Sequence, residues 1–455
     1  MILVCLLVIA GVLAARKLWE LPPAAAACAA VALTIFSGGW ARIGLGGLPF
    51  DRLLLVIVAL SFFLRAPGLA HTPRPQIKGI HLLLGLTIMY VIASAVAAGT
   101  FTGEVGILSI VDRVGVAPYL MFLLAPAIFA GHRERSLLLA TLVGLGAYLG
   151  FTAIFESLGP HSLVFPHYIA QADSELRGER AGGPFQSSVS EGFATFACAV
   201  AAAIAFTQWR SPRWRCVAAV VAGVCVFACF LTLERGVWLA AVTATLVTAL
   251  ATRGGRRWIV PGILACGLVV GGALLLSPSL SSKASARVNR QVSVWDRENQ
   301  SFAGLRMIEA KPLFGFGWNR YTSDSVEYFR QPGAYPMIGY PVPKQLEPLH
   351  DSYLSYAVEL GLVGALLWLV SFLWGMGRGA FSRGPAELRP WKLGLIAISV
   401  FFLVVSFFNP YLAPFSVLVL WVWAGVACGS PSLAAQEQRA KAVAWQSRDI
   451  VWLPA

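Results

Sequence analysis

The sequence predicts an all-α integral membrane protein, with about 12–13 transmembrane helices and a large extracytoplasmic loop before the last of them. Of its 455 residues, 57% are hydrophobic and only 13% are charged, and the mean hydropathy is +0.71. A soluble domain carries about 25% charged residues. The apolar residues extend over the whole chain, which excludes a single anchor on a soluble domain. Because lipid offers the backbone no hydrogen bonds, helices are the expected form.

The net charge and the positions of the cysteines bear on which partners and sites are expected. The formal net charge is +13, which is typical of proteins that contact nucleic acid, a membrane surface or an anionic substrate. No basic block interrupts the apolar runs, so no nucleic-acid partner is expected. The eight cysteines lie in or beside apolar segments. We therefore expect no disulfide framework and no metal site.

The first apolar segment is predicted to be an uncleaved helix. Residues 1–15 are apolar, and the charges of Arg16 and Lys17 follow them. A signal peptide has its charge before the apolar run and a small-residue cleavage site after it. The reversed order predicts a first helix whose N-terminus is outside.

Further along the chain, apolar runs approach the length of about 20 residues that crosses a bilayer. Counting the first, thirteen segments are predicted to span the membrane: 1–15, 21–37, 48–64, 80–98, 114–130, 136–157, 189–208, 216–233, 236–252, 258–278, 352–377, 391–409 and 412–429. The last two are separated only by Asn409 and Pro410.

The basic residues predict the orientation of these segments. Alternate connections, together with the C-terminal tail, hold 20 Lys and Arg residues, whereas the other short connections hold only 6, among them Arg113 and Arg235. Basic residues are enriched in cytoplasmic loops. The richer set is therefore predicted to be cytoplasmic.

This orientation divides the chain into six predicted parts. They are N-terminal transmembrane helices (1–157), an extracytoplasmic loop (158–188), central transmembrane helices (189–278), a large extracytoplasmic loop (279–350), C-terminal transmembrane helices (351–429) and a cytoplasmic tail (430–455). The large loop is rich in aromatic residues and is expected to pack as short helices over the membrane face. A helix is predicted from Arg297 to Lys311, ended by Pro312 and the Gly315–Gly317 turn.

Two outer connections contain arginines that are candidates for binding an anion. Arg177 and Arg180 come shortly before a Gly-Gly-Pro turn, and Arg offers phosphate oxygens a rigid donor fork. Glu234 and Arg235 lie between two strongly apolar segments, where a charge normally has a partner or faces a cavity. The alternatives are a solvated loop for the first pair and, for Arg235, a side chain that reaches the lipid headgroups.

Two more patterns frame the end of the large loop. Residues from Arg306 to Trp318 have the pattern of a helix, a helix stop and a glycine turn. This pattern is interpreted as mostly structural, and Arg306 is a candidate ligand contact. His350 lies where the chain re-enters the membrane, and Asp351 or Ser352 is a candidate cap for the helix that follows. A helix N-terminus disfavours a charged imidazole, so His350 is a candidate proton acceptor. The alternative is a histidine that only packs.

Together these motifs resemble the O-antigen ligase and polymerase superfamily of bacterial membrane glycosyltransferases. The resemblance rests on four motifs in order: Arg180 with Gly-Gly-Pro-Phe, Glu-Arg235-Gly-Val-Trp-Leu, Arg306 through Trp318, and His350-Asp-Ser-Tyr-Leu through Gly364. It covers roughly residues 170–375 in motif detail. Glu234 departs from the family pattern, which often has a small residue there.

The resemblance implies a metal-independent transfer that needs no cofactor. The donor would be a glycan on undecaprenyl diphosphate, and the acceptor a glycan or lipid-linked hydroxyl at the outer face of the bacterial inner membrane. Arg180, Arg235 and Arg177 would bind the diphosphate, and His350 would activate the acceptor. Glu234, Arg306, Asp351 and Tyr353 are possible supporting residues. Direct displacement would invert the anomeric centre.

Two alternatives to a ligase stay open at this point. A polymerase would join lipid-linked repeats of O-antigen, capsule or exopolysaccharide with the same chemistry. Outside the enzyme class, a transporter or lipid flippase would show repeats and ionisable residues at mid-membrane. Glu359, inside its apolar segment, is the nearest such residue, and no repeat is apparent.

Overall fold

The computed structural model describes most of the chain. It covers residues 21–37, 44–45, 48–65, 75–171, 180–252, 292–329, 348–409 and 413–429, and a few short pieces between 254 and 282. The predicted segments 1–15 and, for the most part, 258–278 lie outside the described residues. So do Arg177, residues 330–347 of the large loop and the tail from residue 430.

The described part of the chain is helical apart from one pair of two-residue strands. Up to the first outer loop the elements are α2 (Pro23–Leu33), η1 (Thr34–Phe36), β1 (Gly44–Leu45), β2 (Leu48–Pro49), α3 (Phe50–Arg65), α4 (Gly79–Ala97), α5 (Gly103–Ser109), the π-helical turn η3 (Ile110–Val114), α6 (Val116–Ile128), α7 (His132–Leu158), η4 (His161–Leu163) and α8 (Tyr168–Gln171). Strands β1 and β2 pair antiparallel, Gly44 opposite Pro49.

The second half contains the elements that build the site. They are η5 (Gly183–Phe185), α10 (Ser188–Gln208), α11 (Pro212–Leu231), α12 (Arg235–Ala251), η6 (Arg256–Trp258), α15 (Val292–Ala310), α16 (Tyr321–Asp324), α17 (Val326–Phe329), α18 (Ser352–Phe381), η7 (Ala386–Leu388), α19 (Arg389–Val405) and α20 (Pro414–Cys428).

The all-α membrane fold is confirmed. Among the described residues, seven helices are long and apolar enough to cross a membrane, and three shorter apolar helices accompany them. Eleven of the thirteen predicted segments overlap these helices or α3. The connection between the last two is longer than predicted, because α19 ends at Val405 and α20 begins at Pro414.

One predicted boundary is wrong. Residue 114 was expected to begin a span, but the apolar stretch begins at Gly106 and continues to Ile128. Arg113, expected in a short outer connection, instead lies inside this stretch on the π-helical turn. Gly115, with φ +107°, follows it and leads into α6. A buried ion pair, described below, explains how a charged side chain is accommodated there.

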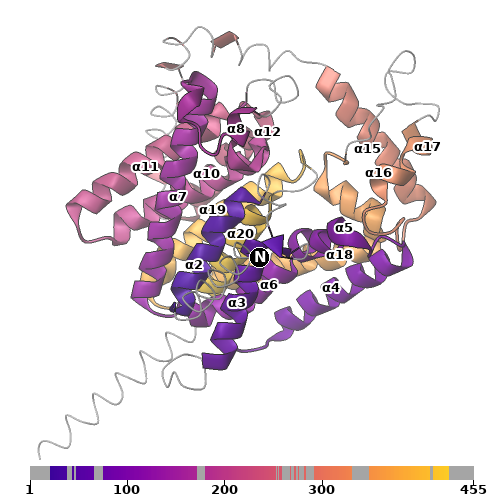
Figure 1. The fold of residues 1–455 in the computed structure, drawn as a ribbon, viewed down its shortest axis with the longest axis horizontal. Helices are drawn as coiled ribbons and strands as arrows, with labels where there is room; N and C mark the ends of the chain where they lie inside the picture. The colour runs from indigo at the N-terminus through magenta and orange to yellow at the C-terminus, as the bar shows by residue number, and fades with distance from the viewer. Residues whose placement is uncertain are drawn as a thin grey trace, which may run out of the picture.

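The helices form two neighbouring groups (Figure 1). On one side α7, α10 and α11 pack against each other, and on the other α18 packs against α4 and α15. Small residues allow the close approach in the first group. A Cβ atom on Gly146 of α7 would lie 2.8 Å from the Cβ of Cys198 and 2.9 Å from the Sγ of Cys225. Such small residues are typical of contacts between membrane helices, where packing replaces the hydrophobic effect.

The longest membrane helix, α18, is broken at Gly361. This residue has φ 68° and ψ 179°, which interrupts the helical ladder. The carbonyls of Val358 and Glu359 accept instead from the backbone N–H groups of Phe316 and Gly317, at 2.9 and 2.8 Å. The turn that ends the predicted helix of the large loop is therefore bound into the middle of α18.

Further backbone groups at this break are also hydrogen-bonded. The Tyr90 hydroxyl donates to the Leu360 carbonyl at 2.8 Å, and the Leu362 N–H donates to the Pro312 carbonyl at 2.8 Å. An unsatisfied backbone group costs several kcal/mol in lipid. The loop can approach α18 this closely because residue 361 is a glycine. A Cβ on Gly361 would lie 2.2 Å from the Leu313 carbonyl oxygen.

Substitution of Gly361 by Ala is expected to destabilise the protein. The backbone conformation alone costs a non-glycine residue about 1–3 kcal/mol, and the clash with Leu313 adds to it. Thermal unfolding of the purified protein in detergent measures the effect. Gly377→Ala in the same helix is the matched control, because its Cβ meets nothing within 4 Å. Equal stability of the two variants would contradict this account of the break.

Candidate functional site

Arg180 lies on a loop held by the ends of two helices. The Ala181 N–H donates to the Leu231 carbonyl at the end of α11, at 3.2 Å. The N–H groups of Gly182 and Gly183 both donate to the carboxylate of Glu156 near the end of α7, the shortest at 2.9 Å. This glycine turn is therefore fixed from α7 and α11, and it sets the position of Arg180.

Glu234 joins two arginines that are far apart in the sequence. Its carboxylate receives Arg180 Nη1 at 2.7 Å on one oxygen and Arg297 Nη2 at 3.3 Å on the other. Glu234 is only 3% exposed, and it directly precedes α12. A partner was expected for a charge between these two apolar segments, and the Glu234 carboxylate has two, Arg180 and Arg297. Arg297 was not among the predicted site residues.

Arg235 is the first residue of α12 and is exposed. The N-terminus of a helix carries unsatisfied N–H groups and a partial positive charge, which favours anions. Arg180, Arg297 and the start of α12 thus surround one carboxylate with positive charge. Such an arrangement suits a phosphate group, to which Arg binds with two parallel hydrogen bonds.

His350 is held by a buried glutamine on α15. Its Nδ1 lies 2.8 Å from Gln300 Oε1, and its backbone N–H donates to the same oxygen at 3.2 Å. An amide oxygen only accepts hydrogen bonds, so Nδ1 must carry a proton. In the neutral ring Nε2 is then the acceptor, which is the state that a general base needs.

The residues after His350 have structural roles. Asp351 caps α18, because its Oδ1 accepts from the N–H groups of Tyr353 and Leu354 at 2.8 and 3.1 Å. The predicted cap is confirmed. Burial raises the pKa of Asp351, although these two hydrogen bonds act in the opposite direction. The Tyr353 hydroxyl donates to the Leu403 carbonyl at 2.8 Å and so ties α18 to α19.

Helix α15 brings the arginines and the histidine together. Arg297 and Gln300 are three residues apart on it, and residues at this spacing share one face of a helix, with Cβ atoms about 5–6 Å apart. Arg297 binds Glu234, and Gln300 binds His350. One turn of α15 therefore connects the carboxylate cluster to the imidazole.

The connection after α19 also links the start of α12 to the start of α18. A Cβ on Gly236, in the first turn of α12, would lie 2.9 Å from the Cβ of Phe408. The connection after α19, which contains Phe408, also binds the start of α18. The Ser352 N–H donates to the Ser406 carbonyl at 2.9 Å, and the Ser352 hydroxyl donates to the Asn409 carbonyl at 2.6 Å. Gly236, next to Arg235, and Ser352, two residues after His350, therefore both contact the connection after α19.

Arg306 donates from Nη1 to the Tyr328 carbonyl at 2.9 Å. This contact holds α15 against α17 within the large loop. The helix predicted from Arg297 to Lys311 is observed as α15, which begins five residues earlier, at Val292. Of the loop's aromatic residues, Trp318 and Tyr321 are buried, whereas Phe302 and Phe314 are 45% and 68% exposed.

A comparison with known families covers most of this site. Residues 220–369 match the family model described as O-antigen ligase. This match supports the expected resemblance to the O-antigen ligase and polymerase superfamily. The matched range contains Glu234, Arg235, α15 and His350, and it extends past the break at Gly361; Arg180 precedes it. No curated protein matches the chain.

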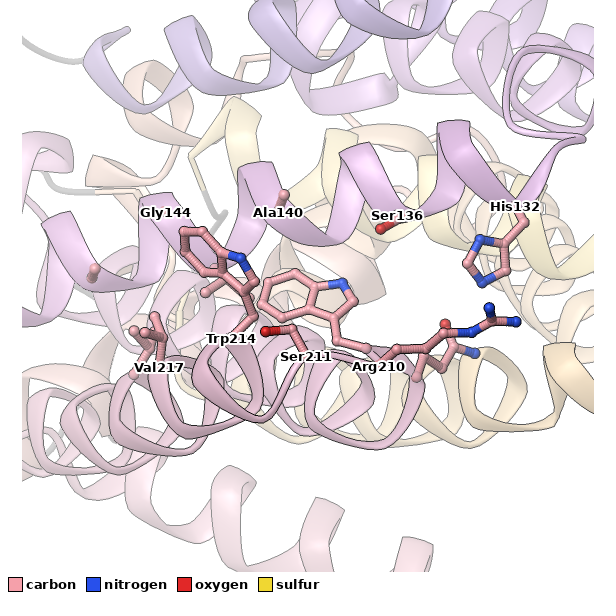
Figure 2. A pocket seen from close by; sticks show the side chains of 13 residues that line it. His132, Ser136, Ala140, Gly144, Arg210, Ser211, Trp214 and Val217 are labelled. Atoms are coloured by element: carbon pink, nitrogen blue, oxygen red, sulfur yellow. The ribbon is translucent and has the colours of Figure 1, made fainter.

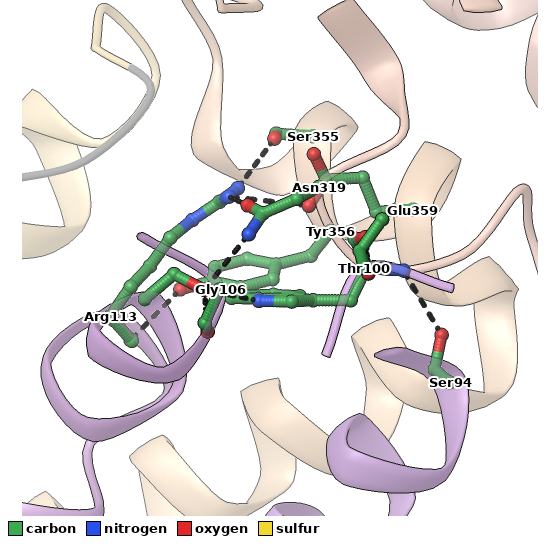
Figure 3. Close-up of polar contacts among 10 residues, drawn as sticks. Ser94, Thr100, Gly106, Arg113, Asn319, Ser355, Tyr356 and Glu359 are labelled. Atoms are coloured by element: carbon green, nitrogen blue, oxygen red, sulfur yellow. Dashed lines mark hydrogen bonds and ion pairs between the residues drawn. The ribbon is translucent and has the colours of Figure 1, made fainter. Parts of the chain in front are cut away.

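A buried cluster that sequence reasoning missed joins Arg113 to residues within the matched segment (Figure 3). Arg113 Nη1 lies 3.2 Å from Glu359 Oε2, and both side chains are at most 10% exposed. The guanidinium also stacks 4.4 Å from the centre of the Trp318 ring. Its other contacts are Nη1 to Asn319 Oδ1 at 3.2 Å, Nη2 to the Ser355 hydroxyl at 2.8 Å, and the Tyr356 ring.

One sequence signal could have found this cluster. Arg113 and Glu359 are ionisable residues of opposite sign in or beside apolar segments, and such residues usually pair. The pair ties the Gly106–Ile128 stretch to α18 near its break. Asn319 and Trp318 extend it to the loop, because both donate to the Ser109 hydroxyl, at 2.8 and 2.9 Å.

Removal of one partner of this pair is expected to be costly. Arg113→Met leaves the Glu359 charge buried and unpaired, which destabilises proteins by about 3–5 kcal/mol. The double variant Arg113→Met with Glu359→Gln is expected to recover much of this loss, because no charge is left unpaired. Unfolding in detergent compares the three proteins. A double variant less stable than Arg113→Met would contradict the pairing.

Proposed function

We propose that the protein transfers a glycan from undecaprenyl diphosphate to an acceptor hydroxyl at the outer face of the bacterial inner membrane. The match of residues 220–369 to the O-antigen ligase family model supports this reaction class. The observation that carries the proposal is the pair of contacts on one turn of α15. Arg297 reaches the arginine cluster and Gln300 reaches His350, so an anion-binding group and a base adjoin.

The arginines are proposed to bind the diphosphate. Arg180 and Arg235 are the main ligands, with Arg177 on the same outer loop as Arg180. As the bond between the sugar and the diphosphate breaks, negative charge grows on the leaving oxygen. Fixed cations stabilise that charge best where water is excluded. Arginine provides this without a divalent metal, so the transfer is proposed to be metal-independent.

His350 is proposed to be the general base. Its Nε2 accepts the proton of the acceptor hydroxyl as the oxygen attacks the anomeric carbon. The new carbon–oxygen bond forms while the bond to the diphosphate oxygen breaks, and its electron pair leaves with the diphosphate. Attack opposite the leaving group inverts the anomeric centre. Gln300 is a positioning residue, because it holds Nδ1 protonated.

The sidedness of the site is proposed from charge. Arg180, Glu234 and His350 lie at the ends of apolar helices whose opposite ends adjoin the basic connections. Basic connections favour the cytoplasm. The site would then face the periplasm or cell exterior, where a lipid-linked donor is reached after it has crossed the membrane.

Glycan transfer in vitro tests the proposal. Purified protein, an undecaprenyl-diphosphate-linked oligosaccharide and EDTA are expected to give transfer to an acceptor. His350→Ala and Arg235→Ala are expected to lower the rate at least about 100-fold, within the range for a base or a charge-stabilising donor. His161→Ala, an exposed histidine elsewhere, is the control. Unchanged transfer by both variants would show the site to be misplaced.

The acceptor class is tested in a deletion strain. Accumulation of long lipid-linked chains would support a ligase, and accumulation of single lipid-linked repeats would support a polymerase. Absence of transfer to any acceptor would favour a transporter.

Substitutions of Gln300 test the positioning of the base. Gln300→Leu is expected to lower kcat about 10–100-fold with little change in KM, since it removes the acceptor that fixes the tautomer. Gln300→Glu keeps an acceptor and adds negative charge, which raises the pKa of a neighbouring imidazole. Its rate profile is expected to shift to higher pH. An unshifted profile, with full activity of the leucine variant, would rule out this role.

A further inference from the structure

A groove lies between α7 and the start of α11, away from the proposed catalytic site. Its volume is about 770 Å³, within the range of cavities that hold small ligands. Figure 2 shows His132, Ser136, Ala140 and Gly144 along one helix, facing side chains from the α10–α11 connection and α11. The groove therefore follows two neighbouring helices rather than penetrating the core.

One end of the groove is cationic and polar. The imidazole of His132 and the guanidinium of Arg210 lie at the same end (Figure 2). Gln208, Ser136 and Ser211 contribute polar groups to the lining. Helices α7 and α11 both begin here, at His132 and Pro212, with no side-chain hydrogen bond to their first N–H groups. This end therefore complements an anion.

The rest of the groove is apolar and suits an extended chain. Ala140, Gly144 and Ala147 leave space along α7, and Val217 and Val221 of α11 form the facing wall. From Ser136 to Ala147 a helix rises about 16 Å, at 1.5 Å per residue. That is roughly half of the ~30 Å hydrocarbon core, which is the depth of one leaflet.

The position of the groove separates it from the catalytic site. Its cationic end adjoins the first residues of α7 and α11. The other ends of these helices hold Glu156 and Leu231, which bind the Arg180 loop. The two sites are therefore at opposite ends of the same helices. Trp209 and Trp214 line the groove, with Trp214 toward its Gly144 end (Figure 2), and tryptophan is enriched at membrane interfaces.

We propose that this groove binds an anionic phospholipid from the leaflet opposite the catalytic site. One acyl chain lies along Ala140, Gly144 and Val221, and the phosphate lies against Arg210 and His132. A free phosphate would leave the apolar part unused, and an uncharged lipid would leave the cationic end unused. The combination of both features selects the anionic phospholipid.

Lipid binding to the full-length protein tests this proposal. The probes are phosphatidylglycerol and phosphatidylcholine with identical acyl chains, presented in mixed micelles, and native mass spectrometry counts the lipids retained. Gly144→Leu fills the groove and is expected to lose retained phosphatidylglycerol at least tenfold. Gly223→Leu is the matched control. A Cβ at either glycine meets nothing within 4 Å, but Gly223 does not line the groove.

The charge is tested separately. Arg210→Gln is expected to reduce the preference for phosphatidylglycerol about fivefold, which corresponds to about 1 kcal/mol for one basic residue near the surface. Arg213→Gln, in the first turn of α11 but outside the lining, is expected to keep the preference. Equal retention by the two leucine variants, or equal retention of both lipids by the wild type, would overturn the proposal. The readout needs no glycan transfer, so it stands apart from the proposed function.

Discussion

A spanning helix must satisfy every backbone polar group without water, and α18 meets this constraint in an unusual way. Its ladder breaks at Gly361, and the exposed carbonyls accept from Phe316, Gly317 and Tyr90 instead. The glycine turn of the large loop is therefore part of the hydrogen bonding of a membrane helix. Helix α15, which carries Arg297 and Gln300, ends just before this turn, so the break also fixes where those two side chains lie.

The Glu234 carboxylate holds two arginines of the candidate site together. Glu234 is nearly buried and contacts Arg180 and Arg297 from two separate loops. Without it, two guanidinium groups would face each other with no anion between them, at a repulsive cost. The carboxylate thus holds the arginines in place while the site is empty. In the proposed mechanism, an incoming diphosphate would compete with this carboxylate for the two arginines.

The sequence predicts local features well and tertiary pairs poorly. Apolar runs located α4, α7, α10 and α18, and the Asp351 cap and the helix after Val292 followed from neighbouring residues. Arg297 and Gln300 were not recognised, because their partners lie 63 and 50 residues away. Arg113 was assigned to a connection since hydropathy alone disfavours a charge inside a span. Its partner Glu359 is 246 residues further along the chain, and only the fold brings them together.

The bonding of Pro312–Gly317 to α18 has a consequence for how such proteins diversify. A loop that only covers a membrane domain can be exchanged between relatives as a module. Here the loop supplies hydrogen bonds to the helix interior, and Arg113 binds both the loop and the helix. A chimera that replaces the loop alone would leave α18 with orphaned carbonyls. The loop, α18 and the residues around Arg113 are therefore expected to change together between relatives.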